Sequence, residues 1–260
     1  MKCPVRQNLR CERLNWRSPR GEKAFPKIPE GVRIYAIGDI HGRLDLLDRA
    51  LSCIDADLHA CPAARAIELF VGDYVDRGPA SRQVLDRLVE RAHAHEIVAL
   101  KGNHESLLLD FLENPEVLEP WQHLGGLETL LSYGLTPSIR NDRESQIKLA
   151  EKLNEVFPDA HRQFIRNLRL SFTCGDFFFA HAGVRPGVAL PWQKEDDLLW
   201  IRDPFLSCKE GFGKIVVHGH TPVLEPDVEY NRINIDTGAF VTGRLTCLLI
   251  EHDKLMLLEV

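Results

Sequence analysis

Three apolar runs in the first half of the chain, each followed at once by a polar loop and a helical pattern, constrain the fold more than any other feature. The runs occupy residues 33–37, 67–71 and 96–100. Behind their loops, helical patterns begin near residues 44, 81 and 106. Successive strand–loop–helix units imply parallel strands joined by right-handed crossovers. We therefore expect an α/β fold in which the three loops meet at one edge of a sheet, where ligands bind in such folds.

The second half of the chain is richer in β-type segments. Residues 168–172 and 177–179 flank the turn Cys174-Gly175-Asp176 and predict a hairpin. Two sheets with flanking helices would accommodate all these strands, and both halves of the chain would then send loops to one rim. The remaining predicted strands are residues 215–217, 232–238, 245–250 and 254–258.

Between residues 114 and 158 the pattern changes, because glycines and prolines interrupt short amphipathic segments around Trp121 and Leu130. We interpret this stretch as a helical insertion that caps the site. Variable segments of this kind often carry specificity. A substrate-selecting cap and a purely packed one are both open on the sequence alone.

Polar side chains gather at the ends of the predicted strands. Carboxylate, imidazole and amide groups together suit Mn, Fe or Zn better than Ca or Cu(I). One carboxylate has two oxygens and can join two metal ions about 3.5–4 Å apart, an arrangement suited to phosphoryl transfer. Arginine supplies a fork that fits phosphate oxygens. We expect Asp73 to be the bridging carboxylate; the other strand-end groups are Asp39, His41, Asp76, Arg77, Asn103, His104, His181, His218 and His220.

Several of these residues also have a simpler interpretation. Asp39 and Asp73 precede helices, where aspartate commonly caps the first turn. Histidines at the ends of apolar strands, such as His181 and His220, are individually more often hydrogen-bonded core residues than metal ligands. His218 is expected either near the phosphate or in a structural role. A further aspartate, Asp236, either orders the floor of the site or forms a turn.

Five motifs, taken together, resemble the PPP-type serine/threonine phosphatases, and most nearly the small bacterial and bacteriophage lambda enzymes. The resemblance extends from about Arg33 to the C-terminus. It implies a metallophosphoesterase-like fold, a two-sheet β-sandwich flanked by helices, in a domain of residues 32–260 with the cap of residues 114–158 inserted. The motifs are Gly-Asp-Ile-His-Gly (38–42), Gly-Asp-Tyr-Val-Asp-Arg-Gly (72–78), Gly-Asn-His-Glu (102–105), His-Ala-Gly (181–183) and Gly-His-Thr-Pro (219–222).

The same resemblance implies two divalent transition-metal ions, with manganese the first expectation in vitro and iron or zinc as alternatives. A hydroxide bridging the metals would attack phosphorus in line, without a covalent phosphoenzyme. The general acid would be His104, oriented by Asp76, and the phosphate would be held by Arg77 and by Arg202, which follows a Leu-Trp pair. The implied metal ligands are Asp39 and His41 at the first ion, Asp73 as the bridge, and Asn103, His181 and His220 at the second.

The activity expected from this resemblance is that of a metal-dependent phosphomonoester hydrolase, specifically a serine/threonine protein phosphatase acting on a phosphoprotein or a small phosphoester. One alternative is a symmetrical diadenosine tetraphosphate hydrolase of the same superfamily. Those enzymes typically have a small residue in place of Asp76 and an aspartate in place of Glu105, so both positions favour the phosphatase. A second alternative, from a different class, is an inactive binding or scaffold protein, although every expected metal ligand is present.

Composition narrows the expected setting. A net charge of −6 argues against a nucleic-acid partner, since such proteins usually carry a clustered basic face. No run of about 18 apolar residues exists, so no membrane-spanning helix is expected. The seven cysteines include no Cys-x-x-Cys pair, which favours a reducing cytoplasm over a disulfide framework or a zinc site. The basic, proline-rich residues 1–31 are interpreted as a flexible or loosely docked N-terminal arm.

Overall fold

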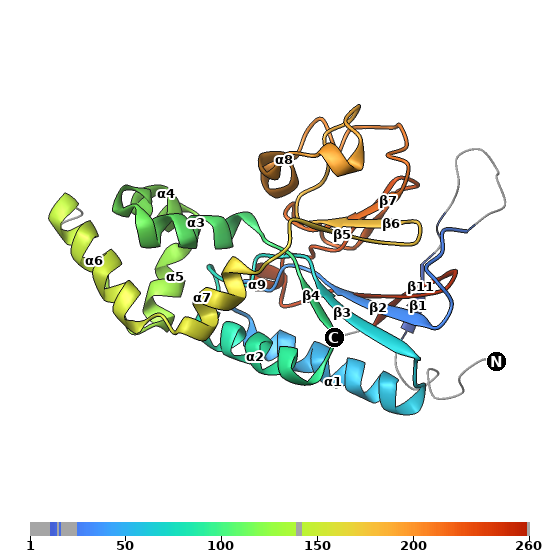
Figure 1. Cartoon of the computed structure of the whole chain (residues 1–260), viewed down its shortest axis with the longest axis horizontal. Helices are drawn as coiled ribbons and strands as arrows, with labels where there is room; N and C mark the ends of the chain where they lie inside the picture. The colour runs from blue at the N-terminus through green and yellow to red at the C-terminus, as the bar shows by residue number, and fades with distance from the viewer. Residues whose placement is uncertain (1–10, 15, 17–24, 139–141, 259–260) are drawn as a thin grey trace.

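Two β-sheets face each other in the middle of the molecule, with helices on their outer sides and a helical extension at one end (Figure 1). The computed structural model describes residues 11–14, 16, 25–138 and 142–258. This is the two-sheet α/β architecture that the sequence predicts.

The first sheet contains the strands that end in the polar loops of the N-terminal half. Its order is β1-β11-β10-β2-β3-β4, and β2, β3 and β4 run parallel, as the strand–loop–helix pattern predicts. Antiparallel pairing of β10 with β2 and of β11 with β10 and β1 completes it. The strands are β1 Cys11–Arg13, β2 Val32–Ile37, β3 Arg65–Phe70, β4 Ile97–Ala99, β10 Cys247–Glu251 and β11 Lys254–Leu258.

The second sheet has the order β5-β6-β7-β9-β8. Its first two strands form the predicted hairpin, and the turn between them places Gly175 at a positive φ of 56°. Because β6, β7 and β9 run parallel, their carboxyl ends lie at one edge of the sheet. The strands are β5 Ser171–Cys174, β6 Phe177–Ala180, β7 Ile215–His218, β8 Asp227–Val228 and β9 Arg232–Asn234.

Helices cover the outer faces of the two sheets and form the extension. Helices α1 and α2 lie along the first sheet, whereas α8 lies over the second (Figure 1). The extension contains α3 to α7, and the short α9 follows β9. The helices are α1 Leu44–Ala60, α2 Ser81–Ala94, α3 Asn103–Glu113, α4 Leu118–His123, α5 Gly126–Ser132, α6 Arg143–Val156, α7 Asp159–Arg166, α8 Glu195–Trp200 and α9 Ala239–Thr242, with 3-10 turns η2 Pro115–Val117 and η3 Leu190–Trp192.

Strand alternation divides the apolar side chains between two layers. On β3, Ile67 and Leu69 point between the sheets, where they meet Phe179 and Leu248. The intervening Phe70 points outward into the layer beneath α1 and α2. Each sheet is therefore fixed from both faces, and the strand ends that carry polar residues are held in a rigid frame.

The helical extension shares its core with the main body. Trp121, Leu130, Tyr133 and Leu149 belong to the same apolar cluster as the buried residues of α1 and α2. Residues 118–132 thus pack directly behind the loop of residues 72–78. The exact limits of a cap domain remain a prediction from sequence.

Part of the predicted N-terminal arm is docked. Strand β1 pairs with β11, and Ile28 is only 2% exposed between the sheets. The backbone N–H of Lys27 donates to Asp176 at the β5–β6 turn. Most of the rest of the predicted arm lies outside the described residues.

The described residues bear on two expectations from composition, one about membrane-spanning helices and one about disulfides. None of the helices there has the length and apolarity needed to cross a membrane. The cysteine spacing predicts no disulfide framework, yet Cys61, at the end of α1, is disulfide-bonded.

Leu248→Ala tests the layer between the sheets. The Leu248 side chain is fully buried there, so its truncation should lower the free energy of unfolding by about 2–5 kcal/mol. Leu224→Ala is the matched control, because Leu224 is 79% exposed and should change stability by less than about 0.5 kcal/mol. Urea denaturation followed by circular dichroism measures both. Equal, small effects would contradict the assigned core.

Candidate metal centre

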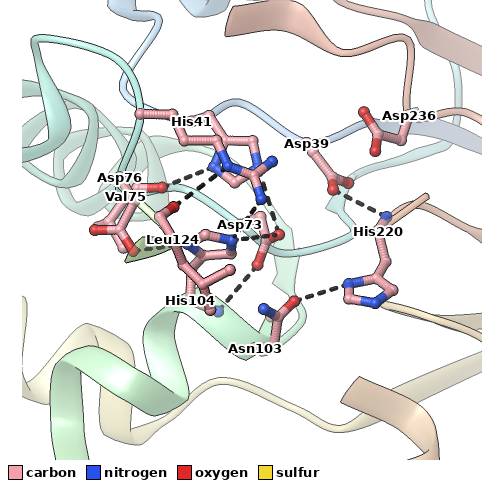
Figure 2. Close-up of polar contacts among 12 residues, drawn as sticks. Asp39, His41, Asp73, Val75, Asp76, Asn103, His104, Leu124, His220 and Asp236 are labelled. Carbon is pink, nitrogen blue, oxygen red and sulfur yellow. Dashed lines mark hydrogen bonds and ion pairs between the residues drawn. The ribbon is translucent and has the colours of Figure 1, made fainter. Parts of the chain in front are cut away.

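The predicted site residues come together from the carboxyl ends of five strands. Asp39 and His41 follow β2, Asp73 follows β3, and Asn103 with His104 open α3 directly after β4. From the second sheet, His181 follows β6 and His220 follows β7. Figure 2 shows Asp73 at the centre, with His41, His104 and Asp76 on one side and Asn103, Asp39 and His220 on the other.

The site is held in a strained backbone. Five of its non-glycine residues have a positive φ, a conformation that costs of order 1–3 kcal/mol each and clusters at functional sites. Two glycines in neighbouring loops leave room for the carboxylates of the site. A Cβ on Gly102 would lie 2.1 Å from Asp73 Oδ1, and one on Gly219 would lie 2.0 Å from Asp39 Oδ1. The five are His41, Asp73, Asp76, Arg77 and His220.

The two oxygens of Asp73 face two different sets of ligands. Oδ2 lies 3.5 Å from His41 Nε2 and 3.8 Å from His104 Nε2, whereas Oδ1 lies 3.4 Å from His181 Nε2. Burial opposes the charge on this carboxylate, but the imidazoles of His181, His104 and His41 together hold its pKa below the ordinary value. This divided arrangement fits a carboxylate that joins two cations.

Lone pairs converge on the side of His181. Its Nδ1 donates to the carbonyl of Val71 at 3.0 Å, and burial lowers its pKa, so the neutral ring presents a lone pair at Nε2. That nitrogen lies 2.9 Å from Asn103 Oδ1, which His220 Nδ1 also approaches at 2.8 Å. An imidazole nitrogen, an amide oxygen and Asp73 Oδ1 thus point at one spot, as ligands of a transition metal do.

His41 presents a similar donor on the other side of Asp73. Its Nδ1 donates to the carbonyl of Val75 at 2.9 Å, and burial lowers its pKa to about 3, which leaves Nε2 as the available ligand atom. Arg77 reaches the same place, with its guanidinium 3.0 Å from His41 Nε2 and 3.1 Å from His104 Nε2. The guanidinium also lies over the ring of Phe240, 4.7 Å from its centroid, a contact that the sequence did not predict.

Asp39 lies at the edge of the site, and its role as a metal ligand stays a prediction. The metal-competent group around Asp73 Oδ2 contains His41 and His104, and Asp39 is not part of it. Asp39 Oδ2 instead accepts from the backbone N–H of His220 at 2.9 Å. Its Oδ1 is buried with no protein partner, and burial, then Asp236 and Asp73, raise its pKa. A buried carboxylate oxygen without a donor is a position that a cation would satisfy, so Asp39 remains a candidate ligand.

His104 and Asp76 form a close pair. His104 Nδ1 lies 2.6 Å from Asp76 Oδ2, and although burial lowers the pKa of His104, Asp73 and Asp76 raise it overall. The extension holds Asp76 in turn, because Trp121 Nε1 donates to Oδ2 at 2.9 Å and Thr129 Oγ1 donates to Oδ1. The helices of the extension therefore orient the predicted general acid, a contribution that the sequence analysis did not anticipate.

Glu105 organises the loop from which the site is built. Its carboxylate accepts backbone N–H bonds from Gly102, Asp73 and Tyr74 at 2.8–3.0 Å. Burial, then Asp73, raise its pKa to about 8, although His104 and the backbone N–H groups of Tyr74 and Val75 favour the charged form. From the sequence, Glu105 was only a family marker. Its position three residues after Gly102, the N-cap of α3, was the available signal for a structural role.

The remaining predicted residues divide between the site and its surroundings. Arg202 Nε lies 3.4 Å from His220 Nε2, beside the second group of ligands. His218 packs against the ring of Phe205 in the cluster beneath α8, which favours its structural interpretation. Asp236 accepts from the N–H of Gly238 at 2.8 Å, and burial raises its pKa to about 6. It therefore forms a turn and also faces Asp39.

A third group of potential ligands lies away from this site. Asp55, Glu68 and His95 come close together on the outer side of the first sheet. Arg91 already bonds both carboxylates, with contacts of 3.0 Å to Asp55 and 2.7 Å to Glu68. The guanidinium supplies the positive charge there, so this group does not require a metal.

A comparison with known families agrees with the geometry. Residues 32–240 match the calcineurin-like phosphoesterases. The chain belongs to this family. It is therefore a metallophosphoesterase, and it contains His/Asp groups that could hold metal ions.

Relatives and solved structures are consistent with that assignment. A protein named bis(5'-nucleosyl)-tetraphosphatase PrpE [asymmetrical] from Anoxybacillus flavithermus is 29% identical over 82% of this chain and 88% of its own. One of the same name from Bacillus cereus (strain AH820) is 30% identical over the same shares. A putative diadenosine tetraphosphatase (21% identity, TM-score 0.57, covering 84% of this chain and 88% of its own) and a cold-active protein tyrosine phosphatase (16%, 0.55, 94% and 85%) share the fold.

Asp73→Asn tests the bridging role of Asp73. Loss of the charge should weaken metal binding by more than about 100-fold, since changes to residues that only orient ligands already cost about 10–100-fold. Metal content per chain, measured by inductively coupled plasma mass spectrometry after exhaustive dialysis, should fall. Asp55→Asn, in the group neutralised by Arg91, should keep the wild-type content. Unchanged metal content in Asp73→Asn would refute the bridge.

Proposed function

We propose that this protein hydrolyses bis(5'-nucleosyl) tetraphosphates asymmetrically, releasing a nucleoside triphosphate and a nucleoside monophosphate. The observation that supports this most is the similarity to relatives bearing that name, which extends over 82% of the chain. The substrate class thus differs from the phosphoprotein that the motifs alone suggest. The proposed reaction breaks a phosphoanhydride bond rather than a phosphomonoester.

The residues that argued for a phosphatase do not oppose this proposal. Asp76 and Glu105 were compared with the pattern of symmetrical hydrolases, whereas the relatives are named asymmetrical. Both residues make structural contacts in this fold that do not depend on the substrate. Asp76 connects the extension to His104, and Glu105 accepts the backbone of the Asp73 loop.

The residues of the site are suited to a polyphosphate. Bound metal ions would supply Lewis-acid stabilisation of phosphate oxygens and lower the pKa of a coordinated water. Arg77 and Arg202 lie on opposite sides of Asp73, next to His41 and His220 respectively. Two guanidinium groups so placed would bind oxygens of successive phosphates and orient the chain for in-line attack.

Product analysis tests the proposal directly. The metal-loaded protein is incubated with diadenosine tetraphosphate, and the products are separated by anion-exchange chromatography. We expect equal amounts of ATP and AMP, formed at a rate of the order of 1–10³ per second, the range typical of enzymes. Two equivalents of ADP would indicate symmetrical cleavage, and no cleavage beside active turnover of a phosphopeptide would overturn the proposal.

A serine/threonine protein phosphatase is the second candidate, and one contact favours it. The His104–Asp76 pair holds a proton close to the site, and a serine or threonine alkoxide leaving group requires one. A nucleotide leaves through a phosphate oxygen, whose second pKa is about 6, and needs no proton at neutral pH. The two substrate classes therefore make different demands on His104.

His104→Asn exploits that difference. Removal of a general acid should lower kcat on a phosphopeptide by about 10²–10⁴-fold. On diadenosine tetraphosphate we expect a loss of about tenfold or less, because the leaving group departs without protonation. His123→Asn, at an exposed histidine bonded only to its own helix, serves as the control. A loss above about 100-fold on the dinucleotide would contradict this division of roles.

A further inference from the structure

Trp200 is a large aromatic side chain that the core does not use. It ends α8, and its neighbours Leu198 and Leu199 are buried while Trp200 is 42% exposed. It belongs to none of the apolar clusters that the described residues form. Its ring is therefore available at the surface for a contact with a ligand.

The indole ring lies against the candidate metal centre. Its centroid is 6.3 Å from that of His220, and the two rings meet edge to face at 82°. An edge-to-face contact occupies one side of an aromatic ring and leaves the rest accessible. The accessible part of Trp200 thus lies beside His220, which belongs to the second group of potential ligands.

Arg202, two residues after Trp200, also reaches His220. Ile201 is 7% exposed and fixes the backbone, while the exposed Arg202 places its Nε 3.4 Å from His220 Nε2. A flat π surface and a guanidinium fork therefore both meet His220. Together they complement a ligand in which an aromatic ring follows a phosphate.

We propose that Trp200 binds a nucleobase of the dinucleoside polyphosphate by stacking, on the His220 side of the site, while Arg202 holds the phosphates next to it. The proposal rests on the proposed function and names the residue that recognises the nucleoside. Stacking on an aromatic ring tolerates every base, because each base has a π face. Trp200 would accordingly confer affinity for nucleosides without strong preference between adenine and guanine.

Kinetics with three variants test this role. Trp200→Ala should raise KM for diadenosine tetraphosphate by about tenfold, the loss expected when one base–aromatic stack is removed. Inorganic tetrapolyphosphate, used as a competitor in the same assay, should inhibit wild type and variant with equal KI because it has no base. Trp200→Phe should recover most of the affinity. Trp192→Ala removes a tryptophan that is 79% exposed on η3 and should leave both constants unchanged.

The outcomes separate this inference from the proposed function. Absence of dinucleotide cleavage by the wild-type protein would refute the proposed function, and the inference with it. Cleavage by the wild type with an unchanged KM in Trp200→Ala would overturn the inference alone. A parallel rise in the KI of tetrapolyphosphate would also overturn it, since that would show a disturbed metal centre rather than a lost stack.

Discussion

The buried carboxylate of Asp73 is the group on which the rest of the site depends. It is 2% exposed at the meeting point of two sheets, where an isolated charge would cost several kcal/mol. The raised pKa of His104 favours a positive charge beside Asp73, which offsets part of that cost. The neutral rings of His41 and His181 lie near different oxygens of Asp73, which gives the site its two-sided form. Cations bound there would complete the compensation that the protein begins.

A carboxylate in this position requires a backbone that does not relax. Glu105 ties the loop that carries Asp73 to the start of α3, through N–H bonds from both segments. The extension fixes the other end of the loop through Trp121 and Thr129, which hold Asp76. Substrate recognition then occurs on this fixed frame, with Arg77 and Arg202 on its two sides. The proposed function and the proposed stacking on Trp200 both depend on that rigidity.

The sequence predicted those elements that local patterns of apolar and polar residues determine. Apolar runs and the loops behind them were sufficient for β2, β3 and β4 and for the helices that follow, because burial of a strand and amphipathic periodicity are local signals. Strand β1 was not predicted, since Cys11–Arg13 has no such pattern and forms by pairing with β11. The short β8 was missed for the same reason.

Within the site, residue types and strand ends predicted which side chains would meet but not every contact they would make. Asp76 receives bonds from residues 45 and 53 positions away, which no local pattern encodes. Asp39 likewise accepts from the backbone N–H of His220, which follows β7 of the other sheet, and no local pattern encodes that contact. The proposed substrate class rests on still less local information. The motifs around His104 and Asp76 predict a phosphatase, whereas the similarity to relatives over 82% of the chain supports the proposed dinucleotide hydrolase.

The central claim is that Asp73 joins two metal ions, and anomalous diffraction from a crystal of the manganese-loaded protein tests it most directly. We expect two anomalous peaks about 3.5–4 Å apart, one next to each oxygen of Asp73. The peak near Oδ2 should be contacted by His41, and the peak near Oδ1 by Asn103 and His181. A single peak, or two peaks that do not share Asp73, would contradict the account.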